Sequence, residues 1–100
     1  MWSGPVLPWH LIQTFLIVKR RHSVVDSSLL LGLSERTIRR HLKQLELLCG
    51  KRLFIGRSKN LTATQLALDL GLLAEQMDHL ADRFAAVVAK DGAVDPANDP

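Results

Sequence analysis

The fold is decided by one stretch, Gly32–Glu46, with the sequence GLSERTIRRHLKQLE. Ser34 predicts the start of a helix, because its hydroxyl can accept a hydrogen bond from a free backbone N–H of the first turn. Glu35 follows where the positive end of the helix dipole favours a negative charge. Ile38, Leu42 and Leu45 then recur at the spacing of one helix face. The stretch therefore predicts an amphipathic helix with one apolar stripe.

The opposite face of this helix is dense in cations. It carries Arg36, Arg39, Arg40, Lys43 and Gln44. A helix with one apolar and one arginine-rich face, entered through a short turn with glycine, is typical of a DNA recognition helix. The alternative is a solvated surface helix, because many basic helix faces bind nothing.

Charge is unevenly distributed along the 100-residue chain, whose length predicts a single small domain. The formal net charge is +3, yet eleven Lys and Arg accompany only three acids between Lys19 and Lys59. From Asn60 onward, seven acids outnumber two basic residues. A basic middle beside an acidic end indicates a polyanion-binding module joined to an element with another role.

Two features bear on the compartment. Cys49 is the only cysteine, so no intramolecular disulfide can form, which suits a reducing cytoplasm. The apolar run from Val6 to Val18 is too short to span a bilayer and contains Pro8, His10 and Gln13. Its charges follow it instead of preceding it, unlike those of a signal peptide. We therefore expect a cytoplasmic protein without membrane contact.

Two helices are predicted before the recognition helix. The first runs from Trp9 or His10 to about Arg21 and has a broad apolar face. Its final Lys19-Arg20-Arg21 complements the negative end of the helix dipole, and a phosphate contact by one of the three is the alternative. The second runs from about Val25 to Leu31 and is capped by Ser23. Two short helices joined by a tight turn at Gly32 form a helix-turn-helix.

A short β-hairpin is predicted after Gly50, which terminates the recognition helix. Lys51–Ile55 is the first strand candidate, Leu61–Thr62 is the return strand, and residues 56–60 form a turn rich in Gly, Ser and Asn. A basic hairpin directly after a recognition helix is typical of a wing, whose tip contacts phosphates or the minor groove. The alternative is an ordinary surface hairpin, since such tips are commonly basic.

The last predicted helix begins after Thr62 or Thr64 and runs to about Ala89. Its apolar residues alternate spacings of four and three, which is the heptad pattern of a helix–helix contact. We call these residues the heptad seam: Leu66, Leu70, Leu73, Met77, Leu80, Phe84 and Val87. Because burying one leucine-sized side chain is worth roughly 1.5–3 kcal/mol, the seam favours pairing and predicts a homodimer. The alternative is a helix folded back on its own domain.

Together these segments predict a mainly α chain. Its core is a winged helix-turn-helix of three helices and a short β-hairpin, and a long linker and dimerisation helix follows. The expected divisions are an irregular arm at 1–8, the winged domain at 9–62, the linker helix at 63–89 and a disordered tail at 90–100.

A series of landmarks runs through the chain in a fixed order. They are Phe15, Ser27-Ser28, Leu33-Ser34, Arg40, Leu45-Glu46, Gly50, Leu53-Phe54 and Leu61-Thr62. In this order and spacing, the stretch from about Leu11 to Phe84 resembles the N-terminal DNA-binding domain of LysR-type transcriptional regulators. The string from Leu45 to Thr62 is the most specific part. The resemblance implies a winged helix-turn-helix, dimerisation through paired linker helices and a role in bacterial transcription.

Departures from the family pattern limit what the resemblance implies. Glu35 and Arg36 stand where the family often has Gln and then Pro, and Arg39 replaces a small residue. Ionised Glu35 only accepts hydrogen bonds, so it suits cytosine N4 and is repelled by phosphate. The wing is about two residues shorter, and Gln65 stands where the linker helix usually has Gly. Base preference therefore does not carry over from the family.

Full-length family members continue into a two-lobed effector-binding domain, and nothing in these 100 residues corresponds to it. The chain is therefore either a piece of a longer regulator or a naturally short protein. We expect no small-molecule ligand within this chain.

The sequence offers little for catalysis. The histidines His10, His22, His41 and His79 are scattered, without Cys or carboxylate partners at metal-ligand spacing. There is no Gly-rich phosphate loop and no nucleophile motif. Cys49 lies on the apolar stripe, which favours a small core residue over a reactive thiol. We therefore expect no metal, no cofactor and no enzymatic activity.

We expect two groups of DNA-contacting residues in a homodimer that binds double-stranded DNA at the nucleoid. The recognition helix would contribute Ser34, Arg36, Thr37, Arg39, Arg40 and Lys43, with Glu35 and His41 as further candidates. The wing would contribute Arg57, Ser58 and Lys59. Two copies would contact dyad-related half-sites about one helical turn apart, or a multiple of that.

A rival interpretation is an interaction protein. In it, the winged fold is an adaptor and the heptad seam binds a different chain. This rival predicts weak, sequence-independent DNA binding and a heteromeric partner.

Overall fold

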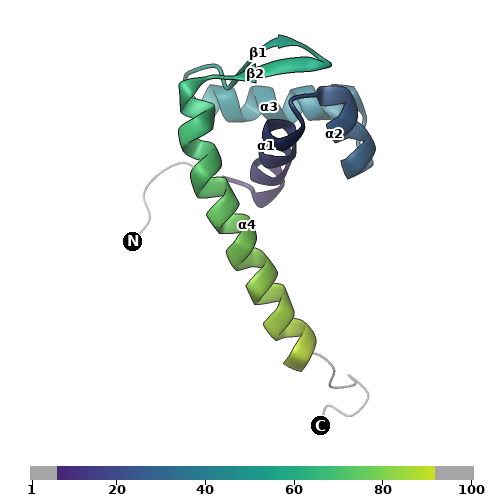
Figure 1. Ribbon diagram of the computed structural model, residues 1–100, viewed down its shortest axis with the longest axis vertical. Helices are drawn as coiled ribbons and strands as arrows, with labels where there is room; N and C mark the ends of the chain where they lie inside the picture. Colours follow the sequence, from purple (N-terminus) through teal and green to yellow (C-terminus); the bar gives the residue numbers. More distant parts are fainter. Residues whose placement is uncertain (1–6, 92–100) are drawn as a thin grey trace.

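A computed structural model describes residues 7–91 of the chain (Figure 1). The elements, in order, are α1 (Trp9–Arg21), α2 (Val24–Leu31), α3 (Glu35–Cys49), β1 (Phe54–Arg57), β2 (Asn60–Ala63) and α4 (Gln65–Asp91). Helices α1 to α3 and the hairpin form one lobe, and α4 runs along this lobe before projecting from it (Figure 1). The predicted fold, a winged helix-turn-helix followed by a long helix, is confirmed.

Helices α2, α3 and α4 begin at short polar side chains, whereas α1 begins after Pro8 without a side-chain cap. The Ser23 hydroxyl accepts the backbone N–H of Asp26 at 3.0 Å, and that of Ser34 accepts the backbone N–H of Thr37 at 3.1 Å. Of the two candidate caps for α4, Thr64 holds this position, since its hydroxyl accepts the N–H of Ala67 at 3.4 Å. These caps fix where α2, α3 and α4 start.

The chain ends extend beyond the described residues. Of the arm expected at 1–8, only residues 7 and 8 are described, and neither is in a helix or strand. Of the tail expected at 90–100, residues 90 and 91 belong to α4, so this helix continues past the expected end at Ala89. The rest of both segments lies outside the described residues.

The hairpin is tighter than the sequence indicated. β1 and β2 pair antiparallel with Arg57 opposite Asn60, so the loop is only Ser58 and Lys59 instead of residues 56–60. Gly56 lies within β1 at φ 117°, and a Cβ there would be 2.5 Å from the carbonyl oxygen of Asn60. Glycine therefore permits the short loop.

The first strand also begins later than expected. It starts at Phe54, whereas the sequence placed its start at Lys51. The Leu53 backbone accounts for the shift: its N–H donates to Glu46 Oε2 at 2.7 Å, and its carbonyl accepts the N–H of Thr64 at 2.9 Å. Both groups are thus directed to α3 and to the start of α4, away from the sheet.

One apolar core connects all the elements. Its buried members are Ile12, Phe15, Leu16, Val18, Val24, Ile38, Leu42, Leu45, Leu53, Phe54, Leu61, Ala67 and Ala74. The ring centroids of Phe15 and Phe54 lie 5.8 Å apart, so these two side chains connect α1 to the hairpin. Cys49 packs against this core, and burial raises the pKa of its thiol, as expected for a small core residue.

Helix α4 meets α1 through small residues. Ala67, Gly71 and Ala74 are buried at spacings of four and three. A Cβ at Gly71 would overlap the side chain of Lys19, so glycine allows this side chain to cross the helix. This docked face is additional to the heptad seam predicted from the sequence, and its signal in the sequence is the helical spacing of small residues.

The heptad seam lies beside this docked face. Leu66 and Leu70 pack partly against the core, but from Leu73 onward the seam is open, with Leu73 57% and Phe84 74% exposed. The outer part of α4 therefore does not fold back on its own lobe.

Candidate nucleic-acid interface

Helix α3 presents its cations outward because its opposite face is buried. Ile38, Leu42 and Leu45 belong to the core, while Arg36, Arg40 and Lys43 are exposed on the other side. Within residues 7–91, these three cations make no ion pair and no side-chain hydrogen bond. Their charges are therefore available to an anionic partner.

The first turn of α3 adds donors beside these cations. The Ser34 hydroxyl donates to Thr37 Oγ1 at 3.0 Å while it accepts the backbone N–H of the same residue. Both side chains thus sit at the exposed, positive end of the helix dipole, which attracts phosphate.

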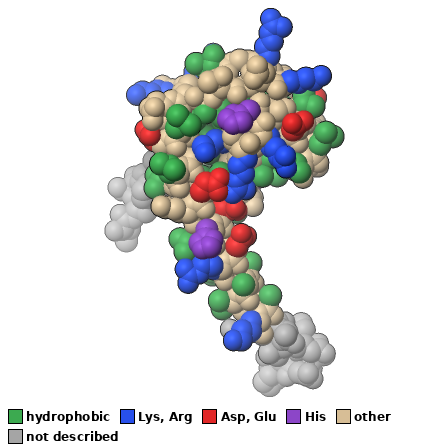
Figure 2. All heavy atoms as spheres, in the orientation of Figure 1, with side chains coloured by type: hydrophobic (Ala, Val, Ile, Leu, Met, Phe, Trp, Pro, Cys, Tyr) green, Lys and Arg blue, Asp and Glu red, His purple; other side chains and the backbone are tan. Residues whose placement is uncertain are grey.

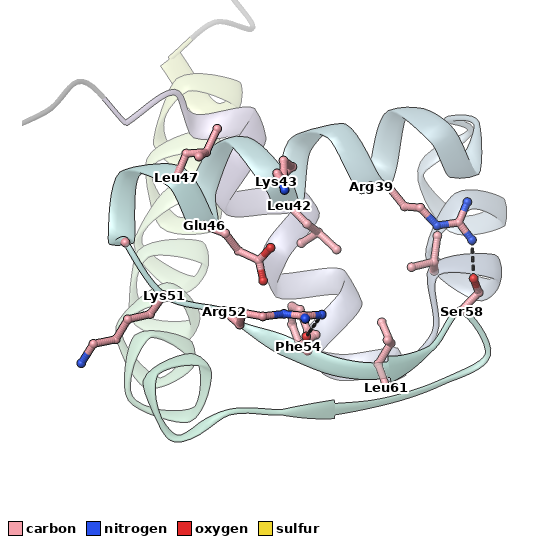
Figure 3. Close-up of a pocket in the computed structure, with 13 residues that line it drawn as sticks. Arg39, Leu42, Lys43, Glu46, Leu47, Lys51, Arg52, Phe54, Ser58 and Leu61 are labelled. Atoms are coloured by element: carbon pink, nitrogen blue, oxygen red, sulfur yellow. Dashed lines mark hydrogen bonds between the residues drawn. The ribbon is translucent and has the colours of Figure 1, made fainter.

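Arg39 differs from the other cations of α3. Its Nη2 donates to Ser58 Oγ in the wing loop (Figure 3) and lies 3.5 Å from Glu35 Oε1. The Glu35 carboxylate therefore faces Arg39, one turn away. Arg39 links the recognition helix to the wing, a role that the sequence analysis did not predict.

The wing is also held by backbone hydrogen bonds at the turn between α1 and α2. The Val24 N–H donates to the Ser58 carbonyl at 2.6 Å, and the Leu61 N–H donates to the His22 carbonyl at 2.8 Å. His22 adopts the left-handed conformation, with φ 55°. Arg57 and Lys59 remain exposed at the hairpin tip. The wing, with these cations at its tip, is therefore attached to the same lobe as α3.

A groove of about 640 Å³ separates α3 from the hairpin (Figure 3). Leu42, Phe54 and Leu61 contribute apolar surface to it. The cations along it are Arg39, Lys43, Lys51 and Arg52. The carboxylate of Glu46 also faces the groove, but it already accepts the Leu53 N–H. The groove between α3 and the wing thus combines an apolar floor with more cationic than acidic side chains.

Lys51 and Arg52 were not among the predicted contact residues. Both were predicted to lie in a strand, but they precede β1 and lie beside the groove. Arg52 donates to the Phe54 carbonyl at 3.3 Å, and Lys51 points away from the groove (Figure 3). In the sequence, the signal for these two groove residues is that two cations directly follow Gly50, the residue that ends α3.

His41 is half-buried and contacts α1. Its Nδ1 shares a 2.8 Å hydrogen bond with the Thr14 hydroxyl of α1, and its ring lies 4.9 Å from that of His10. Burial lowers the pKa of His41, and the neighbouring His10 and Arg40 lower it further. The ring therefore packs in its neutral form against α1, and we leave His41 out of the proposed DNA contacts.

Residues 7–91 contain neither a cluster of metal-binding side chains nor a helix suited to span a membrane. They contain no group of three or more His, Cys, Asp or Glu side chains that could hold a metal ion. None of the described helices combines the length and the hydropathy needed to cross a membrane.

Solved structures share this architecture. The complex described as BenM_DBD/benA site 1 DNA contains a domain with a TM-score of 0.75 and 15% identity, covering 84% of this chain and 98% of that chain. The domain of the CbnR_DBD–DNA complex has a TM-score of 0.74 and 17% identity, covering 86% and 99%. Full-length LysG from Corynebacterium glutamicum, with bound effector Arg, has a TM-score of 0.76 and 24% identity. That match covers 90% of this chain but 31% of LysG. At these identities the matches establish the fold.

A family match goes further than the shared fold. A search of curated proteins gives no match. Residues 9–68, however, match the family described as "Bacterial regulatory helix-turn-helix protein, lysR family". The matched segment runs from the start of α1 to the first turn of α4 and so includes the whole winged lobe. The chain therefore belongs to the lysR family of bacterial transcription regulators, and its winged lobe is a DNA-binding helix-turn-helix domain of that family.

Proposed function

We propose that this protein binds double-stranded DNA with sequence preference, as a homodimer, and regulates transcription through that binding. The observation that carries the proposal is the row of Arg36, Arg40 and Lys43, exposed and unpaired within residues 7–91 on a helix whose other face is buried. A rigid, cationic helix beside an attached wing suits the major groove and the adjacent phosphates.

The proposed contacts fall into two groups. Recognition helix α3 supplies Ser34, Arg36, Thr37, Arg39, Arg40 and Lys43, and the wing supplies Arg57, Ser58 and Lys59. Arg36 and Arg40 are four residues apart on one face, so either can contact guanine or phosphate. The Ser58 hydroxyl accepts a hydrogen bond from Arg39, so we expect these two side chains to contact the DNA phosphate backbone together.

Homodimerisation is supported by the open part of the heptad seam. Leu73, Leu80 and Phe84 are each more than half exposed on a helix that leaves the lobe. Figure 2 shows hydrophobic side chains along this projecting helix. A second copy of α4 would cover them, and two lobes would then address dyad-related half-sites about one helical turn apart or a multiple of that.

The test is selection from a randomised duplex pool, followed by fluorescence anisotropy at two salt concentrations. We expect a dyad-symmetric site to be enriched. Arg40→Ala should weaken binding to that site by about 5- to 150-fold, corresponding to about 1–3 kcal/mol for a base contact, and relax the preference at one position of each half-site.

Arg83→Ala is the matched control, because it removes one exposed cation from α4, away from the lobe. It should leave the selected sequence unchanged. Binding that disappears at moderate salt, with no sequence enriched, would leave only the phosphate contribution and overturn the proposal. A monomeric protein under the same conditions would instead favour a different chain as the partner of the heptad seam.

A further inference from the structure

Helices α1 and α4 are joined by a cluster of three charged residues, Arg20, Glu75 and Asp78. Arg20 Nε donates to Glu75 Oε1 at 2.9 Å, and Arg20 Nη2 donates to Glu75 Oε2 at 2.5 Å. The same Nη2 donates to Asp78 Oδ2 at 3.1 Å. Two parallel bonds from one guanidinium to one carboxylate fix orientation as well as distance. The Arg20 hydrogen bonds also lower the pKa of Glu75, so this carboxylate is ionised at neutral pH.

The cluster lies at the end of the docked part of α4. Ala67, Gly71 and Ala74 are buried, Asp78 and Ala81 are half-buried, and every position from 82 to 90 is exposed. Figure 1 shows α4 leaving the lobe, and Figure 2 shows acidic and basic side chains together near this point. Within residues 7–91, the side-chain hydrogen bonds between α4 and α1 are those of this cluster, which lies where α4 leaves the lobe.

The apolar packing of α4 against the lobe ends near Ala74. Leu66 and Leu70 pack against the core in its first two turns, and its fully buried residues, Ala67, Gly71 and Ala74, are small and interdigitate little with a neighbouring helix. Beyond Asp78 the helix extends about 20 Å at about 1.5 Å per residue, so a tilt of about 10° moves its end by about 3 Å. That displacement is close to the rise of one DNA base pair, about 3.4 Å.

We propose that Arg20 is a positioning residue that, with Glu75 and Asp78, fixes the angle between the winged lobe and α4 and thereby sets the half-site spacing accepted by the dimer. The inference rests on the proposed homodimer. In a dimer joined through the outer part of the heptad seam, the two α4 helices are fixed relative to each other. The direction in which each lobe points then depends on the angle between that lobe and its own α4. A dimer in which this angle is fixed binds half-sites at one spacing, whereas a dimer in which the angle varies binds half-sites at several spacings.

The experiment combines two measurements on the full chain. The first is selection from duplexes whose half-sites are separated by a variable number of base pairs. Wild type should prefer one spacing over its neighbours by about tenfold or more, and Arg20→Ala should reduce this ratio to about threefold or less, with the half-site sequence unchanged. Glu75→Gln should act in the same direction.

The second measurement needs neither DNA nor a dimer. Residual dipolar couplings of backbone N–H groups give the orientation of α4 relative to α1 in the free protein. Arg20→Ala should shift or broaden this orientation, whereas Arg21→Ala, which removes the neighbouring cation, should change neither the orientation nor the spacing. The exchange variant Arg20→Glu/Glu75→Arg should restore both relative to Arg20→Glu alone.

An unchanged α4 orientation in Arg20→Ala would overturn the inference, and so would an unchanged spacing preference. If no dyad site is enriched but the orientation changes, the proposed DNA-binding dimer has failed while the positioning role of Arg20 has not. The two failures are therefore distinguishable.

Discussion

Helices α3 and α4 are both amphipathic, but they expose opposite chemistries. Helix α3 buries large apolar side chains such as Ile38 and leaves cations outside, whereas α4 buries small residues such as Ala74 and leaves large apolar ones outside. Exposed cations are well solvated and attract polyanions, while a row of exposed apolar side chains is unfavourable until it is covered. The difference agrees with the two partners proposed above, DNA for α3 and a second copy of α4 for the heptad seam.

The largest effect is expected from a charge within the heptad seam. Leu72 and Leu73 are adjacent and exposed to similar extents, 68% and 57%, but only Leu73 belongs to the seam. Leu73→Glu should weaken the dimer by at least about 100-fold, because two leucines, one from each copy, lose roughly 1.5 kcal/mol or more apiece. Analytical ultracentrifugation of the free protein measures this shift.

Leu72→Glu is the control, since its side chain points about 100° around the helix from that of Leu73. It should leave the dimer intact. If both substitutions weakened the dimer equally, the chain would associate through non-specific hydrophobic contact. The heptad seam of α4 would then not be a specific pairing surface.

The second prediction concerns the cationic side of the contrast. Lys43→Gln should weaken DNA binding several-fold at low salt and reduce the slope of log affinity against log salt by about 0.9, as expected for one lost phosphate contact. Anisotropy titrations at four or five salt concentrations give the slope. Gln44→Ala, at a neutral exposed neighbour, should leave the slope unchanged. A slope that does not move in Lys43→Gln would exclude this residue from the phosphate contacts.

The third prediction sharpens the description of α3, because one of its cations is also a structural link. Arg39→Ala removes the bond to Ser58 and should increase amide hydrogen exchange in the hairpin by about fivefold, corresponding to about 1 kcal/mol. Exchange in α4 should not change. The measurement is hydrogen exchange by NMR on the free protein.

Ser58→Ala is the companion variant, since it removes the same bond from the wing side. Both variants should accelerate exchange at the same amides. If neither does, the backbone bonds from Val24 and Leu61 hold the wing without help from Arg39.

The sequence predicted those features of both helices that are local. The Ser34 cap, the buried Ile38 and Leu42, and the glycine that ends α3 are all encoded within a few residues, so spacing and capping preferences sufficed. The seam of α4 follows in the same way from a period of four and three. Local signals also placed Arg36 and Arg40 on the exposed face.

The features that the sequence did not predict depend on contacts between distant segments. Arg20 and Glu75 are 55 residues apart, and although the small residues of α4 mark the side that packs, no helical period pairs these two side chains. The Arg39 bond to Ser58 depends on the short hairpin loop, which brings the wing tip back to α3. His41 lies beside the cationic face in sequence, yet the crossing of α1 and α3 directs it to Thr14.

The smallest effect is expected from His41, and it tests where the cationic face of α3 ends. Because burial lowers the pKa of His41, the folded protein favours the neutral ring and the unfolded chain binds a proton more readily. The contribution of His41 to stability is therefore complete above the reference pKa of 6.5 and is lost as the pH falls below it, toward the lower pKa of the folded state. Urea unfolding at about pH 7.5 and about pH 5.5 should show lower stability at the acidic value.

His41→Gln is the informative variant, since its amide can still bond to the Thr14 hydroxyl but does not titrate. It should lose part of the stability difference between the two pH values. If its pH dependence equals that of the wild type, the ring does not contribute to stability through its burial against α1. In that case His41 would return to the set of DNA-contact candidates, and the cationic face of α3 would be wider than the structure indicates.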